Sequence, residues 1–264
     1  MSHLTTLTDA LALGSARVVA FTGGGGKTSA MFRLAHELAD ARVLVTTTTR
    51  IWAPRPEQAE VVVSDDLQQA RARLLADWQR GVRALGTALG ADGKLQGVPA
   101  EWVTVLATEA DYVLVEADGA AGKPLTAPRA HEPVIPQAAA LVIPLAGVDA
   151  VGAPLDAAHV HRVAEIAALT GLAQGEVLTA TAVATILLSP HGNVKGAPAA
   201  ARIVPLLNKV ETARSQRAAR AVAAALLARG AERVLLTRLA ADPPVVAIVS
   251  ATRADVAVQQ LERT

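Results

Sequence analysis

A run of four glycines between a predicted strand and a predicted helix is the feature that most constrains this fold. The residues before it, Val18 to Thr22, are mostly apolar and β-branched, which predicts a buried strand. The residues after it, Ala30 to Leu38, have the apolar spacing of a helix. Strand, glycine loop and helix in this order are the setting of a phosphate-binding loop. The candidate binding residues are Gly23, Gly24, Gly25, Gly26, Lys27, Thr28 and Ser29.

The residue types of this loop suit a polyanion. Glycine lacks a Cβ atom, so the loop can turn its N–H groups inward and an anion can approach the backbone closely. The helix N-terminus adds partial positive charge, Lys27 can reach the β- and γ-phosphates, and Thr28 can bind Mg²⁺. The longer pattern G-x-x-x-x-G-K-[ST] is not met, because Phe21 replaces its first glycine, but G-G-x-G-K-[ST] fits from Gly23 to Thr28. The flanking strand and helix disfavour the alternative, a flexible turn with an incidental lysine.

A second predicted strand brings carboxylates to such a loop. The apolar run 112–115 is followed by Glu116 and Asp118, which point the same way on an extended backbone because they are two residues apart. The arrangement resembles a Walker B strand, whose carboxylate holds the water shell of Mg²⁺ or orients the attacking water. We therefore assign Lys27, Glu116 and Asp118 to catalysis, and Thr28, Glu116 and Asp118 to Mg²⁺. The alternative is an Asp-Gly turn with a solvated Glu116.

Composition limits the classes of partner. Hydrophobic residues make up 52% of the 264 residues, which supplies a sizeable core, and aromatic residues only 2%. The formal net charge is +1 with Lys and Arg spread along the chain, so we expect no nucleic-acid partner. The chain has no cysteine, which excludes disulfides and cysteine nucleophiles. The first ten residues are polar and mixed, and no apolar run reaches the roughly 18 residues of a membrane span, so we expect a soluble, cytoplasmic protein with no membrane partner.

The remaining pattern alternates strands and helices. It predicts strands at 41–46, 60–64, 140–145, 203–207, 233–237 and 247–250, and helices at 4–13, 66–78, 101–109, 175–188 and 213–229. The segments 82–89 and 95–98, joined by an Asp-Gly turn, predict a hairpin. We also expect Asp156 to cap a helix that carries His159, His161, Arg162 and Glu165.

Two segments offer further ligand contacts. The threonine cluster 46–49 ends a predicted parallel strand, where hydroxyl groups can bind Mg²⁺ or a γ-phosphate, although threonine also simply favours strands and turns. Residues 120–136 are rich in proline and charge and have no periodicity, which is typical of a functional loop. Its candidate contacts are Lys123, Arg129, His131 and Glu132, each of which can equally be a surface residue.

A later strand ends in Asn208, Lys209 and Glu211, which echoes the guanine-reading Asn-Lys-x-Asp element of GTPases with Glu in place of Asp. We expect these three residues to contact the base. The Ser250–Ala251 pair after the last strand echoes the element that backs guanine. The alternative is a helix start at which Glu211 or Thr212 acts as the cap. The residues leave the choice between ATP and GTP open.

Taken together, the motifs resemble the YqeC family, from about residue 18 to residue 250. They are F-T-G-G-G-G-K-T-S, V-T-T-T-T-R-I, V-E-A-D-G-A-A-G-K-P-L, H-E-P-V-I-P and L-N-K-V-E, together with the H-x-H-R segment around His161. Members of that family are regarded as accessory proteins of selenium-dependent molybdenum hydroxylases. The resemblance implies a P-loop protein that binds a nucleoside triphosphate during maturation of these enzymes or their cofactor. It also implies a hydroxylase subunit or a molybdopterin-type cofactor as a partner.

These patterns predict an α/β protein like the P-loop NTPases, with a mainly parallel sheet and helices on both faces. We expect one domain over residues 1–264 with a lid-like excursion at about 119–200. The leading functional hypothesis is slow Mg²⁺-dependent hydrolysis of ATP or GTP, slow because no arginine finger is evident in the chain. The alternatives are a small-molecule kinase or nucleotidyl transferase acting on a molybdopterin-type acceptor, and a non-catalytic chaperone switched by nucleotide. The sequence leaves the oligomeric state open, with a homodimer as one option.

Overall fold

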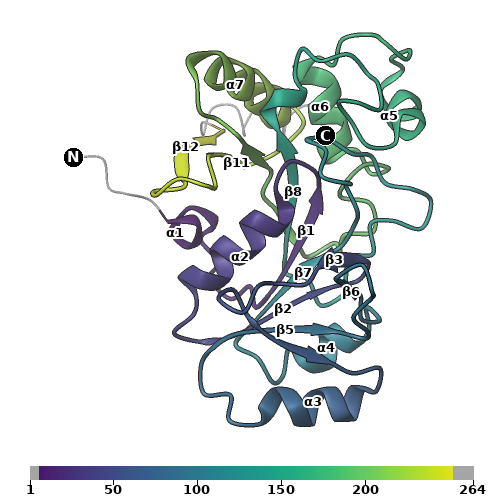
Figure 1. The fold of residues 1–264 in the computed structure, drawn as a ribbon. Coiled ribbons are helices and arrows are strands. Elements are labelled where there is room, and N and C mark those ends of the chain that lie inside the picture. The colour runs from purple at the N-terminus through teal and green to yellow at the C-terminus, as the bar shows by residue number, and fades with distance from the viewer. Residues whose placement is uncertain (1–5, 252–264) are drawn as a thin grey trace.

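The computed structural model describes residues 6–251, and one large sheet organises them (Figure 1). Its strands lie in the order β12-β11-β10-β8-β1-β7-β2-β5-β4, with β9 beside β8. Neighbouring strands are parallel except for β12, which runs antiparallel to β11. The strands are β1 Val18–Gly23, β2 Arg42–Thr47, β4 Glu60–Val63, β5 Gly81–Gly86, β7 Tyr112–Glu116, β8 Leu141–Gly147, β9 Arg202–Ile203, β10 Leu206–Asn208, β11 Arg233–Thr237 and β12 Val245–Ser250.

Helices cover both faces of this sheet. The alternation of β1 sends Val19 and Phe21 to the cluster under α1 and α2, while Val18 and Ala20 join the cluster that contains α3 and α4. The face that carries α3 and α4 continues toward β11, where α5, α6 and α7 form a further cluster with residues of β8, β10 and β11. The expected α/β fold with a mainly parallel sheet is therefore confirmed. The helices are α1 Leu7–Leu11, α2 Lys27–Glu37, α3 Leu67–Leu75, α4 Trp102–Leu106, α5 Val163–Thr170, α6 Ala180–Leu188 and α7 Ala213–Leu227, and a 3₁₀ turn, η1, spans Val148–Ala150.

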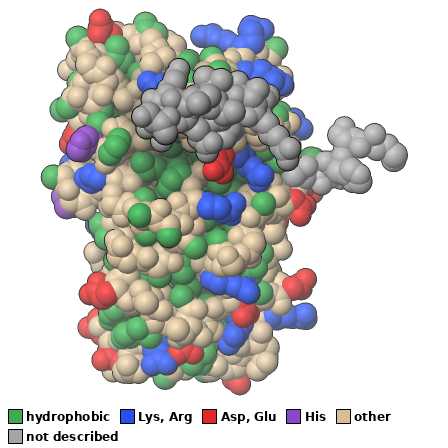
Figure 2. Space-filling view, turned by 180° about the vertical axis from the view of Figure 1, so that it is seen from behind, with side chains coloured by type: hydrophobic (Ala, Val, Ile, Leu, Met, Phe, Trp, Pro, Cys, Tyr) green, Lys and Arg blue, Asp and Glu red, His purple; other side chains and the backbone are tan. Residues whose placement is uncertain are grey.

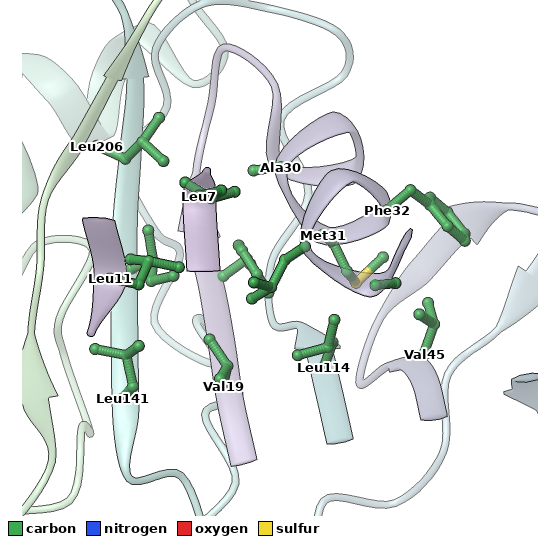
Figure 3. Close-up of a cluster of buried hydrophobic side chains, with 14 of the residues drawn as sticks. Leu7, Leu11, Val19, Ala30, Met31, Phe32, Val45, Leu114, Leu141 and Leu206 are labelled. Atoms are coloured by element: carbon green, nitrogen blue, oxygen red, sulfur yellow. The ribbon is translucent and has the colours of Figure 1, made fainter. Parts of the chain in front are cut away.

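The core under α2 fixes the orientation of that helix (Figure 3). Met31 and Leu34 of α2 are fully buried over β1 and β7, which contribute Val19 and Leu114 to the same cluster, and Leu141 of β8 lies below Leu11 of α1. Burying side chains of this size contributes roughly 1.5–3 kcal/mol each. The start of α2, and with it the glycine loop, is thus held over the carboxyl ends of the central strands.

A two-stranded ribbon lies outside the main sheet and corrects the predicted hairpin. The strands β3 (Arg50–Trp52) and β6 (Lys94–Gln96) pair antiparallel. The segment 82–89 does not form one arm of a simple hairpin, because β5 joins the parallel sheet beside β2 and β4. Only the tip of the predicted hairpin forms, where Leu89 bridges Leu95. The Asp92–Gly93 turn itself forms, with the Gly90 N–H donating to the carbonyl oxygen of Lys94 at 2.8 Å, but burial between two parallel neighbours places β5 in the main sheet.

Two predicted helix starts have different outcomes. The helix predicted at 175–188 begins later, at Ala180, where Thr179 caps α6 and its hydroxyl accepts the Ala182 N–H at 3.1 Å. Asp156 does not cap α5, whose N-cap position is occupied by Arg162 in the left-handed region. The Asp156 carboxylate instead accepts the N–H groups of Ala158 and His159 in a local turn. The N-terminal helix covers Leu7–Leu11, and the first residues of the range predicted for it lie outside the described part of the chain.

The segment from 119 to 200 is not one continuous excursion. It contains β8, which lies beside β1 in the centre of the sheet, and α6, which packs on β8 and α7. Residues 120–136 contain no helix or strand, as expected of a binding loop. On the face shown in Figure 2, acidic and basic side chains are interspersed over the lower half, and Lys and Arg are densest near the end that carries α7.

Candidate functional site

The glycine loop between β1 and α2 requires glycine at positions 23 and 25. Gly25 has φ +77°, and a Cβ atom there would lie 2.0 Å from the backbone nitrogen of Gly147. Gly23 has φ +87°, and a Cβ atom there would lie 2.3 Å from the carbonyl oxygen of Leu145. Both positions combine a left-handed backbone with close approach to β8, so no other residue type fits without displacement. The loop is therefore shaped by its contact with the neighbouring strand.

The backbone N–H groups that are available to an anion belong to the start of α2 rather than to the middle of the loop. The N–H groups of Gly24 and Gly25 donate to the carbonyl oxygens of Leu145 and Lys123, at 2.9 and 3.0 Å. The first-turn N–H groups of a helix have no partner within that helix. In α2 they belong to Lys27, Thr28 and Ser29, all of which line the cleft. An anion at this place would also meet the positive end of the α2 dipole.

Lys27 lies inside a buried ion cluster. Its Nζ atom donates to the carbonyl oxygen of Gly23 at 2.5 Å and lies 3.1 Å from Oδ1 of Asp118 and 3.6 Å from Oε1 of Glu116. Burial acts to lower the pKa of Lys27, but the two carboxylates outweigh it and raise this pKa above its ordinary value. Burial raises the pKa of both Glu116 and Asp118 against the opposing attraction of Lys27. Two carboxylates and one ammonium leave an excess negative charge, which favours a bound cation.

The two carboxylates occupy different environments. Glu116 lies at the end of β7 and lines the cleft, and its Oε2 atom accepts the Thr28 hydroxyl at 2.7 Å. Asp118 is fully buried, and its Oδ2 atom accepts the Gly23 N–H at 2.8 Å. Glu116 and Thr28 thus present oxygen atoms to the cleft, whereas Asp118 fixes the loop and Lys27 from below.

Asn208 is committed to the glycine loop. Its Nδ2 atom donates to the carbonyl oxygen of Gly25 at 2.8 Å, and its Oδ1 atom accepts the Leu239 N–H at 3.0 Å. Lys209 lines the cleft and pairs with Asp149 at 2.7 Å. The exposed Glu211 is outside the cleft lining, and the helix start considered as the alternative is present, with Thr212 as the N-cap of α7.

The second element of the GTPase echo is not beside the first. Because β12 runs antiparallel to β11, Ser250 pairs with Arg233 at the start of β11. Ser250 therefore lies at the amino end of β11, away from the glycine loop, so the likeness of Ser250–Ala251 to the guanine-backing element does not extend to its position. Apolar alternation predicts a strand but not its direction, which is why the sequence pattern misled here.

The threonine cluster 46–49 at the end of β2 supports the backbone. The hydroxyl groups of Thr46, Thr47 and Thr48 donate to the carbonyl oxygens of Leu85, Glu116 and Val134. The structural interpretation of this cluster, as residues that favour a strand end and turn, is the one that the contacts support. Thr47 donates to the backbone carbonyl of Glu116, whose side chain accepts the Thr28 hydroxyl, so the cluster helps to position Glu116.

Several groups surround one open cleft of about 820 Å³ in front of the glycine loop. The start of α2, Glu116 and the β3–β6 ribbon all line it. Lys123 of the irregular loop also lines it and donates to the carbonyl oxygen of Ala158 at 2.7 Å. Sequence reasoning missed Trp52 and Lys94 on the ribbon, because a single tryptophan and a single lysine in a short strand carry no motif.

The other candidates of the irregular loop behave differently from Lys123. Glu132 is buried and forms an ion pair with Arg162, which sequence reasoning placed on a helix rather than against this loop. Arg129 and His131 are exposed. Burial and the neighbouring Arg162 lower the pKa of His161, which disfavours its charged form.

Within residues 6–251, no group of three or more His, Cys, Asp or Glu side chains is placed to hold a metal ion. A site built on Thr28 and Glu116 would therefore need further oxygen ligands from water or from a phosphate. None of the helices described is long and apolar enough to cross a membrane.

The fold and the site define the class: an α/β protein with a mostly parallel sheet, like that of P-loop NTPases, with a glycine-rich loop leading from the central strand into a helix. A family model described as "YqeC protein" matches residues 19–164. The chain is 33% identical over 203 residues to the "Uncharacterized protein YqeC" of Escherichia coli (strain K12). The aligned region covers 73% of this chain and 75% of that protein. The chain belongs to the YqeC family.

Proposed function

We propose that this protein binds a Mg²⁺–nucleoside triphosphate in the cleft before the glycine loop and hydrolyses it slowly. One observation carries the proposal: the Thr28 hydroxyl at the start of α2 lies 2.7 Å from the Glu116 carboxylate at the end of β7, beside the first-turn N–H groups of α2. N–H groups that can donate to phosphate oxygens, a hydroxyl and a carboxylate meet at one place, which is what binding of a metal-bound phosphate requires.

The donor set fits Mg²⁺. This ion prefers oxygen ligands and usually keeps several waters beside one or two carboxylates and the phosphates of a substrate. Thr28 and Glu116 supply two such oxygen atoms, and the excess negative charge of the Lys27 cluster supplies the attraction. When bound, the ion would neutralise charge on the phosphate oxygens. Asp118 would support the site by holding Gly23 and Lys27.

The residues of this chain also explain why turnover should be slow. Lys27 would exchange a carboxylate partner for a phosphate oxygen, and the α2 N–H groups would bind the rest of the anion. An arginine that stabilises the transition state speeds such reactions by about 10³–10⁵-fold. Arg162, near the site, is held by Glu132 in a buried ion pair and is therefore not free to act in this way. Glu116 is the group placed to orient a water against the terminal phosphate.

The cellular role in this proposal comes from the family resemblance. It is that of an accessory factor in the maturation of molybdenum hydroxylases or of their cofactor. A transferase acting on a molybdopterin-type acceptor, and a nucleotide-switched chaperone, are the two other functions compatible with the same cleft. The exposed Trp52, which lines the cleft, favours the transferase, because its ring can contact an aromatic acceptor.

Calorimetric titration with ATP and with GTP in the presence of Mg²⁺ tests the proposal, together with release of phosphate. Lys27→Met should abolish detectable binding and turnover, because the phosphate loses its cation. Lys195→Met is the matched control, since Lys195 lies outside the cleft lining. Thermal unfolding of both variants checks that they fold. Equal affinity and turnover in wild type and Lys27→Met would refute a nucleotide at this loop.

A further inference from the structure

The β3–β6 ribbon presents a tryptophan to the cleft. In its register Ile51 faces Leu95 and Trp52 faces Lys94. Ile51 and Leu95 are buried, so strand alternation turns Arg50 and Trp52 to the outer side. Both of these residues line the cleft together with the glycine loop. The ribbon is thus anchored by its inner face, and its outer face is available to a ligand.

The indole of Trp52 is not needed by the core. Trp52 is 65% exposed, whereas Trp78 is 5% exposed. The ammonium of Lys94 lies 4.7 Å from the centroid of the Trp52 ring, which is cation–π distance and limits the positions of the ring. A large, oriented and exposed aromatic surface inside a cleft is a stacking platform for a planar ligand.

The ribbon lies on the side of the cleft that a terminal phosphate would occupy. The Thr48 N–H, just before β3, donates to the carbonyl oxygen of Glu116 at 3.1 Å, and Figure 1 shows β3 and β6 next to the ends of β2 and β7. A triphosphate whose metal is held by Thr28 and Glu116 has its terminal phosphate on this side. Its ribose and base then extend toward β10, where Asn208 and Lys209 line the cleft.

The charges around Trp52 suit an anionic ligand. Lys94 stands over the ring, and Lys123 lines the cleft on the irregular loop. Arg50 pairs with Asp92 at 2.9 Å, an exposed ion pair that a ligand anion can replace at little cost. The carboxylates that face this part of the cleft are Asp92, through Arg50, and Glu116.

From these observations we infer that Trp52 stacks a second ligand, a planar aromatic heterocycle that carries an anionic group, next to the terminal phosphate of the bound nucleotide. The inference rests on the proposed function, because the position of the terminal phosphate defines which side is which. It makes the ribbon the acceptor side of the cleft. Arg50 and Lys94 bind the anionic group of that ligand, and Trp52 selects for its ring.

The test uses the full chain with Mg²⁺ and a non-hydrolysable ATP or GTP analogue, titrated with a phosphorylated pterin as the probe. Trp52→Ala should weaken binding of the probe by roughly tenfold or more, the loss typical of a removed stacking partner, and leave nucleotide affinity unchanged. Trp52→Phe should restore most of the affinity for the probe. Arg50→Ala should weaken the phosphorylated pterin more than the same pterin without phosphate.

Leu89→Ala is the matched control, because Leu89 is an exposed apolar residue that bridges β6 but lies outside the cleft lining. Loss of nucleotide affinity in Trp52→Ala by the same factor as probe affinity would overturn the inference, since the ring would then stack the base of the nucleotide. Absence of probe binding to the nucleotide-loaded wild type, or equal binding by wild type and Trp52→Ala, would also overturn it. A failure of the proposed function is recognised separately, as absence of nucleotide binding in the first titration.

Discussion

At the scale of single residues, the two carboxylates after β7 should separate by experiment. Asp118 accepts the Gly23 N–H and is the nearer partner of Lys27. Asp118→Ala leaves that N–H without its acceptor and removes one ion pair in a fully buried place, so it should lower the free energy of unfolding by about 3 kcal/mol. Glu116→Gln removes one of two like charges beside one ammonium, so at neutral pH it should not lower stability, while it should weaken Mg²⁺-dependent nucleotide binding at least tenfold. Urea unfolding and calorimetry measure the two effects. A loss of stability in Glu116→Gln as large as that in Asp118→Ala would contradict these roles.

Glu116 should also make the free energy of unfolding depend on pH, with a sign that its raised pKa defines. Burial raises the pKa of Glu116 in the folded protein above its ordinary value of 4.5. A carboxyl whose pKa is raised by folding stabilises the protein most below its unfolded pKa, and that contribution is lost as pH rises through the folded pKa. The unfolding free energy of Glu116→Gln, relative to wild type, should therefore increase from acidic to neutral pH in the absence of Mg²⁺. Urea unfolding at several pH values tests this, with Glu57→Gln, at an exposed glutamate, as the control variant. A relative stability that falls with rising pH would reverse the sign and exclude a raised pKa.

At the scale of elements, the glycine loop should tolerate no side chain at its closest contact with β8. Gly25→Ala places a Cβ atom 2.0 Å from the Gly147 nitrogen at φ +77°, so the loop must shift. Gly175→Ala is a matched control, because Gly175 has φ +89° but no atom lies within 4 Å of where its Cβ would be, and so it carries only the backbone strain of about 1 kcal/mol. Gly25→Ala should lose more stability than Gly175→Ala and lose nucleotide binding by at least tenfold. Chemical unfolding and calorimetry of the pair measure both quantities, and similar losses in the two variants would show that the contact with β8 is unimportant.

The sequence predicted the elements whose signals are local. The strand–glycine–helix order at 18–38 and the acidic end of β7 were readable because the residues that act together are adjacent in the chain. The direction of β12 was not, because alternation is the same in both directions, and the pairing of β5 was not, because the parallel neighbours that bury it are distant in sequence. Trp52 in the cleft, and the ion pair of Arg162 with Glu132, were not predicted for a related reason: Lys94 lies more than 25 residues from Trp52, and Glu132 more than 25 residues from Arg162.

At the scale of the whole molecule, Asn208 couples two parts of the sheet. It stands at the end of β10, two strands from β1, and joins the Gly25 carbonyl to the backbone of Leu239, which follows β11. Two side chains thus hold the glycine loop. Asp118, after β7, accepts the Gly23 N–H, and Asn208, at the end of β10, donates to the Gly25 carbonyl. A residue in this position acts on the shape of the glycine loop, and so on the proposed phosphate site, even though the sequence pattern around it suggests base reading.

That coupling predicts how Asn208→Ala should alter nucleotide binding. The variant frees the Gly25 carbonyl and the Leu239 N–H without touching the phosphate donors of α2, so the loop loses its lateral support. Affinity for ATP and for GTP should then fall by the same factor, about tenfold, because what is lost is common to both nucleotides. Lys209→Ala, at the exposed neighbour that lines the cleft, is the companion variant that reports contact with the base. Calorimetric titration of both nucleotides gives the two ratios. A change of more than about threefold in the ATP-to-GTP ratio of Asn208→Ala, roughly 0.6 kcal/mol, would show that its amide reads the base and that its bond to Gly25 is replaced when nucleotide binds.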